Sequence, residues 1–150
     1  MSIRKYLYVF FLIPLLAISQ EKKSFHLKDI IYLKANEGEK VDSFLKSRYF
    51  DYVGIDSQSN SHAYALNYDN SNGEATTWCY KYLDGRVKVL ESDGGKLIMF
   101  IKEELNTFKS NFEYQTDGWV MTSYFYKQYA IGIRENDVLD KYELYIENQL

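Results

Sequence analysis

Few residues in this chain have the chemistry for nucleophilic or acid–base catalysis. It contains one cysteine, Cys79, and two histidines, His26 and His62. A cysteine nucleophile needs an imidazole within hydrogen-bonding distance, so geometry is the first requirement. In the alternating strand patterns, His62 shares a face with Tyr64, whereas Cys79 lies on the face opposite to Trp78. If both aromatic residues point inward, the thiol and the imidazole point apart, and the sequence predicts no cysteine–histidine pair.

Sequence motifs for other catalytic classes are also missing. The chain has no Gly-x-Ser-x-Gly, Walker, His-Glu-x-x-His or dinucleotide-binding motif. The oxygen-rich run Asp69–Glu74 suggests a calcium loop, but Tyr80 occupies the position where an EF-hand needs its bidentate glutamate. An Asx-rich hairpin turn explains the same residues, and no spacing pairs two carboxylates as in a glycosidase. We therefore expect neither a metal ion nor a cofactor, and the sequence favours a non-enzymatic function.

The first residues have the three parts of a secretory signal peptide. Arg4 and Lys5 form a basic region, Tyr6–Leu16 is apolar, and small residues precede a cleavage site after Ser19. The apolar run is shorter than the roughly 20 residues that a membrane-spanning helix needs. We therefore expect a cleavable signal peptide at 1–19, no transmembrane anchor in the mature chain, and a periplasmic or secreted protein.

Length and charge limit the remaining possibilities. The chain has 150 residues, with 18 Lys+Arg against 21 Asp+Glu and a net charge of −3. Removal of Arg4 and Lys5 with the leader makes the rest more acidic, which argues against nucleic acid as a partner. Residues 20–150 are enough for one domain, and a single cysteine cannot form an internal disulfide. We expect one domain at 20–150 that is stabilised by its core.

Apolar residues recur at helical spacing in three segments. These segments are 27–34, 36–48 and 96–109. In the second segment, Asn36 and Glu39 match a capping box, which predicts that this helix begins after Asn36.

Six other segments alternate between two faces, as strands do. They are 62–68, 76–82, 86–91, 119–126, 129–134 and 141–147. The order ααβββαβββ predicts an α+β domain in which an antiparallel sheet of about six strands, formed by two three-strand meanders, packs against helices. The helix-plus-meander unit occurs twice, which suggests a tandem duplication. This layout is similar to that of secreted inhibitors with the β-lactamase inhibitor fold, a resemblance of architecture that implies no site residues.

Strand alternation divides the sheet residues between two faces. The face expected under the helices carries Tyr64, Leu66, Trp78, Tyr80, Val87, Val89, Trp119, Phe125, Ile131, Ile133 and Leu144. The opposite face then carries cations, tyrosines and Thr122, and tyrosine and arginine commonly supply binding hot spots. The residues predicted to bind a partner are Lys81, Arg86, Lys88, Tyr124, Tyr126, Arg134, Lys141 and Tyr145.

Three functions fit these features. The first is an exported, non-enzymatic binding module of the inhibitor or immunity-protein kind, acting on a protein or an anionic envelope polymer. The alternative is a secreted hydrolase or carbohydrate-binding protein in which Trp78, Trp119 and tyrosines stack on sugar rings. A structural envelope subunit that pairs through an edge strand near 141–147 is the third.

Overall fold

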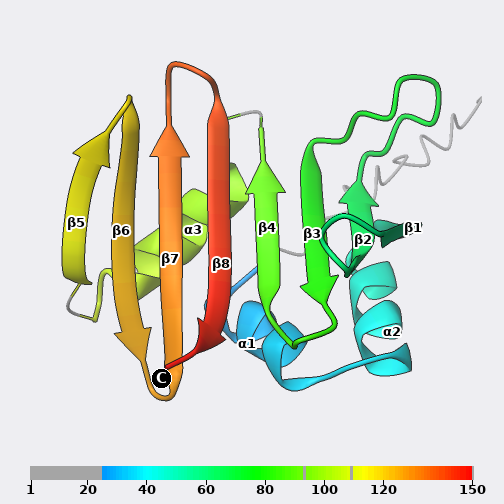
Figure 1. The fold of residues 1–150 in the computed structure, drawn as a ribbon, viewed down its shortest axis with the longest axis horizontal. Helices are drawn as coiled ribbons and strands as arrows, with labels where there is room; N and C mark the ends of the chain where they lie inside the picture. The colour runs from blue at the N-terminus through cyan, green and yellow to red at the C-terminus, as the bar shows by residue number, and fades with distance from the viewer. Residues whose placement is uncertain (1–24, 93, 109, 150) are drawn as a thin grey trace, which may run out of the picture.

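A computed structural model describes residues 25–92, 94–108 and 110–149, so the expected signal peptide at 1–19 lies outside the described residues. The helices are α1 (Leu27–Ala35), α2 (Glu39–Ser47) and α3 (Lys96–Leu105). The strands are β1 (Phe50–Asp56), β2 (Ser61–Leu66), β3 (Thr77–Tyr82), β4 (Val87–Glu91), β5 (Ser110–Thr116), β6 (Trp119–Tyr126), β7 (Tyr129–Asn136) and β8 (Lys141–Asn148), as labelled in Figure 1. Over this part of the chain, no helix has the length and apolar character to cross a membrane.

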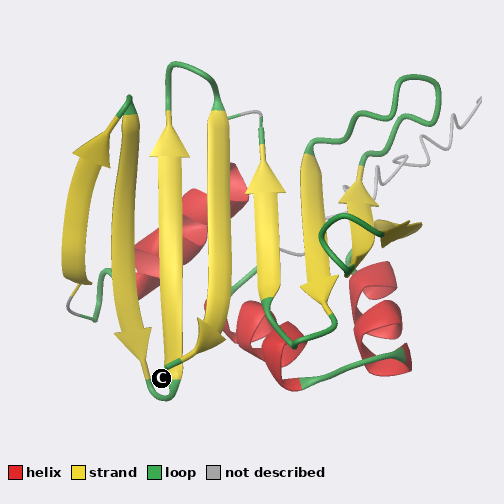
Figure 2. Cartoon of the chain, in the orientation of Figure 1, coloured by secondary structure: helices red, strands yellow, loops and turns green. Residues whose placement is uncertain are grey.

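One antiparallel sheet contains the eight strands of the described residues, in the order β1-β2-β3-β4-β8-β7-β6-β5. Helices α2 and α3 are each followed by a four-stranded meander, and the two meanders join where β4 pairs with β8 (Figure 2). The α+β class and the antiparallel sheet are therefore confirmed. The expected count of about six strands is wrong, because β1 and β5 also belong to the sheet.

Both additional strands have irregular pairing. The register of β1 against β2 shifts between Tyr52 and Gly54, and that of β5 against β6 shifts between Ser110 and Phe112. A bulge interrupts the two-residue alternation by which a strand is recognised in a sequence. The residues of β1 and β5 therefore do not show the regular alternation by which the other six strands were predicted.

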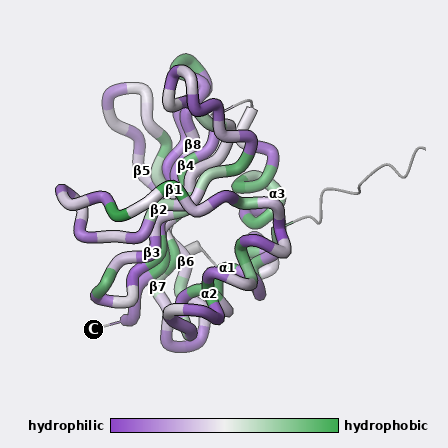
Figure 3. Tube along the Cα trace, turned by 90° about the vertical axis from the view of Figure 1, so that its right-hand side faces the viewer, coloured by the Kyte–Doolittle hydropathy of each residue, from purple (hydrophilic) through white to green (hydrophobic). Residues whose placement is uncertain are grey.

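The three helices in the described part of the chain lie on one side of the sheet. In Figure 1, α3 passes behind β6, β7 and β8, and the side view in Figure 3 places α1, α2 and α3 together on one side. The core between the two layers contains Ile30, Leu33, Val41, Leu45, Val87, Val89, Ile98, Ile101, Leu105, Ile131, Ile133, Leu144 and Ile146. The opposite side of the sheet has no helix over it in the described part of the chain.

The predicted inward face is only partly correct. Val87, Val89, Ile131, Ile133 and Leu144 are buried as expected, as is Tyr64, and Leu66 packs against the core. The aromatic residues Trp78, Tyr80, Trp119 and Phe125, however, lie on the uncovered face.

The pairing of β3 shows the reason. Cys79 pairs with Tyr64 and with Val89, two residues that face the helices, so its neighbours Trp78 and Tyr80 must face away. Strand β3 buries its smaller residues, Thr77 and Cys79, and the expectation that its large aromatic residues point inward was wrong.

Carboxylates from other elements accept backbone N–H groups at the starts of α3 and α1. Helix α3 begins after Gly95, whose φ is 57°, and the Glu91 carboxylate of β4 accepts the backbone N–H groups of Leu97 and Ile98 at 3.0 and 2.9 Å. The first N–H groups of a helix lack intrahelical partners, so a carboxylate there is stabilising.

At the start of α1, Glu104 of α3 has the same role. Its Oε2 accepts the Leu27 N–H at 2.6 Å, and its Oε1 lies 2.8 Å from His26 Nδ1. The capping box expected at Asn36 and Glu39 is wrong, because α2 begins after Gly38 and Asn36 follows the last residue of α1.

Candidate binding face of the sheet

The sheet face opposite the helices is the candidate functional surface, and we call it the open face. Strand register places on its central part Trp78, Tyr80, Tyr82, Lys88, Leu90, Trp119, Met121, Arg134, Glu143 and Tyr145. Each of these ten side chains is partly exposed. The open face therefore combines aromatic, aliphatic and charged groups that are fixed by a continuous sheet.

An aromatic row follows β3. The rings of Trp78 and Tyr80 are stacked, with centroids 5.9 Å apart and planes 17° apart, and Tyr68 meets Trp78 edge-on at 5.6 Å. Across the pairing, Trp78 and Tyr80 face Ala65 and Ala63 of β2, which are both buried. Large rings beside two alanines form a raised ridge along β3.

A charged group lies next to this ridge, on β4, β8 and β7. Glu143 Oε2 is 3.2 Å from Arg134 Nη1 and 3.5 Å from Lys88 Nζ. The Arg134 guanidinium also lies 4.6 Å from the centroid of the Trp119 ring, in a cation–π arrangement. Two cations share one carboxylate, so this group carries one net positive charge. The contribution of Glu143 was missed, because only the pairing of β8 with both β4 and β7 brings it between the two cations.

Tyr145 occupies the centre of the open face. It pairs with Lys88 on one side and with Gly132 on the other. A Cβ atom at Gly132 would lie 2.0 Å from Tyr145 Cζ, so the phenol ring rests directly on the glycine backbone. Partial burial raises the pKa of the Tyr145 hydroxyl.

Five of the eight predicted binding residues belong to the face opposite the helices. Lys88, Arg134 and Tyr145 lie in its centre. Arg86 lies at one end, where its Nε is 2.8 Å from Asp84 and its guanidinium is 4.9 Å from the Tyr82 ring. Lys141 is exposed at the start of β8 and alternates with the core residue Tyr142.

The other three predicted residues lie on the helix-covered face, so the prediction that all eight share one face is wrong. Lys81 is buried, and its ammonium donates hydrogen bonds to the carbonyl oxygens of Leu33 at 2.9 Å and Gly85 at 3.1 Å. Loss of hydration on burial lowers the pKa of Lys81. This lysine therefore joins the end of α1 to the β3–β4 turn.

Tyr124 and Tyr126 of β6 also face the helices. Tyr124 is buried beside the buried Thr122 on the same face, and its hydroxyl donates to Asn106 Oδ1 at 2.9 Å. Tyr126 packs against the core, and its ring meets Phe108 edge-on at 4.8 Å. Strand β6 pairs Tyr124 with the core residue Ile131, which fixes this side of the strand inward.

The relative orientation of Cys79 and His62 differs from the one expected from the sequence. Cys79 and His62 lie on the same, helix-covered face, because their partners Tyr64 and Lys81 do. The thiol is fully buried, and desolvation raises its pKa to about 12. His62 Nδ1 is instead 3.2 Å from the Tyr52 hydroxyl. In the described residues, no three or more His, Cys, Asp or Glu side chains are grouped to hold a metal ion.

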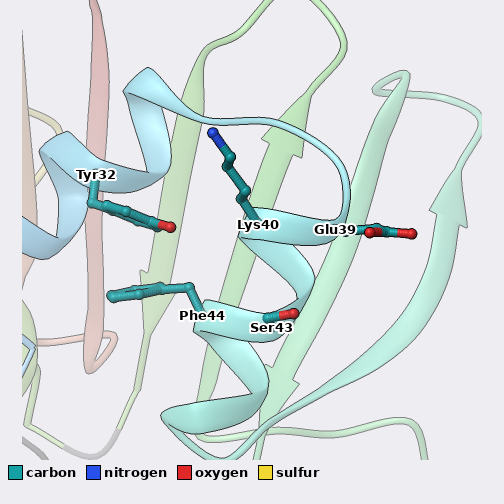
Figure 4. A pocket seen from close by; sticks show the side chains of 5 residues that line it. All are labelled: Tyr32, Glu39, Lys40, Ser43 and Phe44. Atoms are coloured by element: carbon teal, nitrogen blue, oxygen red, sulfur yellow. The ribbon is translucent and has the colours of Figure 1, made fainter.

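Among the shallow grooves of the described residues, two lie on the helix side. One lies between α1 and α2 and is lined by Tyr32, Glu39, Lys40, Ser43 and Phe44 (Figure 4). The rings of Tyr32 and Phe44 pack together there with centroids 4.7 Å apart, and Figure 4 shows Glu39 pointing away from them. The other groove contains the His26–Glu104 pair, whose carboxylate also holds the start of α1. The polar pair of this second groove is therefore explained by its role at the start of α1.

No protein-family model, curated protein or solved structure matches this chain. The candidate site therefore rests on geometry alone.

Proposed function

We propose that this protein is an exported, non-enzymatic binding module of the inhibitor or immunity-protein kind, which holds a protein partner on its open face. The observation that carries the proposal is the uncovered sheet face with a fixed aromatic ridge beside the Lys88–Glu143–Arg134 group. Large aromatic side chains and arginine dominate the energetics of protein interfaces, because each offers a wide contact area and a polar group.

The rigidity of this surface supports the proposal. The open-face side chains project from β3, β4, β6, β7 and β8, whose other face is covered by the helices. A partner therefore does not have to order a loop on binding, which lowers the entropic cost of association. Lys88 and Arg134 outnumber Glu143, so an acidic side chain of the partner is favoured beside this group.

A carbohydrate ligand is the second candidate, and one observation favours it. Trp78 and Trp119 lie on the open face and are partly exposed, with Trp78 stacked on Tyr80, and exposed aromatic rings are the groups that stack on sugars. A binding assay with insoluble peptidoglycan and chitin tests this candidate directly. Retention of the wild-type protein, abolished in Trp78→Ala, would favour the carbohydrate.

The protein partner is tested by affinity capture from envelope extract, followed by measurement of the dissociation constant for the captured protein. Lys88→Glu and Tyr145→Ser alter the centre of the open face, whereas Lys40→Glu makes the same charge change on the helix side. We expect the first two variants to weaken binding by roughly tenfold or more, as interface hot spots do, and the third to leave it unchanged. Equal affinity for all variants would show that the open face is not the binding surface.

A further inference from the structure

The turn between β7 and β8 exposes two neighbouring aliphatic side chains. Val138 is 91% exposed and Leu139 is 54% exposed. Both lie in the four-residue connection from Asp137 to Asp140, at the end of the sheet where Figure 1 shows this turn projecting. Turns of this kind normally carry glycine, asparagine, aspartate or serine, because those residues fit the backbone and are well hydrated. Turn formation therefore does not explain why valine and leucine occupy these two positions.

The turn backbone is held firmly by its surroundings. The buried side chain of Asn136 accepts the Leu139 N–H at 3.0 Å through Oδ1, and the Tyr142 hydroxyl donates to Asp137 Oδ1 at 2.9 Å. The Gly94 N–H donates to Asp140 Oδ1 at 2.8 Å. Three neighbouring groups thus fix the turn, while its two aliphatic side chains point into solvent.

Tyr142 is itself fixed in place. A Cβ atom at Gly95 would lie 2.2 Å from Tyr142 Cγ, so the ring is packed against the backbone just before α3. Residues 137–140, which we call the β7–β8 tip, are therefore held by contacts with the sheet and with the β4–α3 connection. A preformed loop loses little conformational freedom on binding, which makes its exposed side chains effective contacts.

The charges around the tip are mainly negative. Asp137 and Asp140 flank the aliphatic pair, and the β5–β6 turn adds the exposed Asp117. That turn is adjacent, because a Cβ atom at Gly118 would lie 3.4 Å from Asn136 Nδ2. Lys141 is the one cation among residues 137–141. The complementary surface is an apolar pocket with lysine or arginine at its rim.

We infer that the β7–β8 tip is a contact surface of its own, which inserts Val138 and Leu139 into an apolar, basic-rimmed pocket of a protein partner. This contact is separate from the open face, since it lies at the end of the sheet and is acidic. It does not require that the open face binds the same protein.

Site-specific photo-crosslinking in the producing cell tests this inference on the full chain. Benzoylphenylalanine replaces Val138 in one variant and Leu83 in a matched control. Leu83 is also exposed, at 62%, and lies in the β3–β4 turn at the opposite end of the sheet. The adduct is mapped on the partner, and the purified partner is then titrated with wild type, Val138→Ser/Leu139→Ser and Leu83→Ser.

We expect a specific adduct from position 138, absent from position 83, that maps to an apolar pocket with basic neighbours. The double serine variant should bind that partner at least roughly tenfold more weakly, with an unchanged melting temperature because both side chains are exposed. Absence of a specific adduct from position 138, an adduct on a flat or acidic surface, or unchanged affinity of the double variant would overturn the inference. Titration of Lys88→Glu against the same partner separates the two surfaces, since loss in that variant alone supports only the open face.

Discussion

The ring of Tyr145 packs against the backbone of Gly132, and this contact fixes the position of the ring at the centre of the open face. A Cβ atom at position 132 would be 2.0 Å from Tyr145 Cζ and 2.2 Å from its hydroxyl oxygen. A glycine in a strand interior is normally unfavourable, so its presence here is explained by the aromatic ring that covers it. The open face thus depends on a residue with no side chain.

Gly132→Ala should displace the Tyr145 ring. Overpacking of this kind costs about 1–3 kcal/mol in the free energy of unfolding, measured by urea denaturation. The double variant Gly132→Ala/Tyr145→Ser should lose much less than the sum of the two single changes, because the clash is then gone. Additive losses would mean that the two residues do not contact each other.

Lys81→Met should destabilise the protein while leaving partner binding intact. The change leaves the carbonyl oxygens of Leu33 and Gly85 without their buried donor, at a cost of about 1–3 kcal/mol. Lys88→Met is the matched control on the open face, where loss of a partly exposed ion pair costs about 1 kcal/mol or less. Unfolding by urea distinguishes them, and equal stability of Lys81→Met and wild type would contradict the buried role.

Glu91→Ala should destabilise the start of α3. The carboxylate accepts two N–H groups at the positive end of this helix, and removal of such a cap costs about 1–2 kcal/mol. Glu91→Gln keeps an acceptor oxygen and should lose less. Glu103→Ala, an exposed change on α3 itself, serves as the control and should alter stability little.

Stability should fall between about pH 10 and pH 12. The hydrogen bond to Asp137 is the main cause that raises the pKa of Tyr142 to about 12, from the usual 10.0. The folded state therefore keeps a proton that the unfolded state loses, so this stabilisation is complete below pH 10 and is lost as the pH rises through 12. Lys81, whose pKa is lowered, acts in the opposite direction. The pKa values of five further tyrosines are raised as well: Tyr64, Tyr80, Tyr82, Tyr124 and Tyr145.

The pH effect is measured by urea denaturation at pH 8, 10 and 11.5 for wild type and Tyr142→Phe. The phenylalanine variant lacks one of the titrating groups, so it should lose less stability than wild type over this range. A wild-type protein that is equally stable at all three values would show that the raised tyrosine pKa values do not operate.

Regular alternation predicted most of the sheet, but it could not decide which side of β3 faces inward. Trp78, Tyr80 and Tyr82 form the more hydrophobic row, and burial of that row was the natural expectation. The structure buries Cys79 and Lys81 instead, and Lys81 is accommodated only because α1 ends with carbonyl oxygens beside it. The alternation of residues in β3 does not reveal a hydrogen-bond partner that comes from α1.

Within the candidate site, the residues whose orientation depends only on their own strand could be predicted from the sequence. Lys88, Arg134 and Tyr145 lie on the expected face of the sheet because each alternates with clear core residues in its own strand. Glu143 was missed, because its role depends on β8 lying between β4 and β7. The two bulged strands, β1 and β5, were not predicted for a similar reason, because their pairing rather than their composition defines them as strands.

The claim that the open face binds the partner is tested most directly by amide hydrogen exchange of the captured complex against the free protein. We predict slower exchange and local protection along β3, β4, β7 and β8, centred on Lys88 and Tyr145, with α1 and α2 unchanged. Protection confined to the helices, with these four strands exchanging as in the free protein, would contradict the claim.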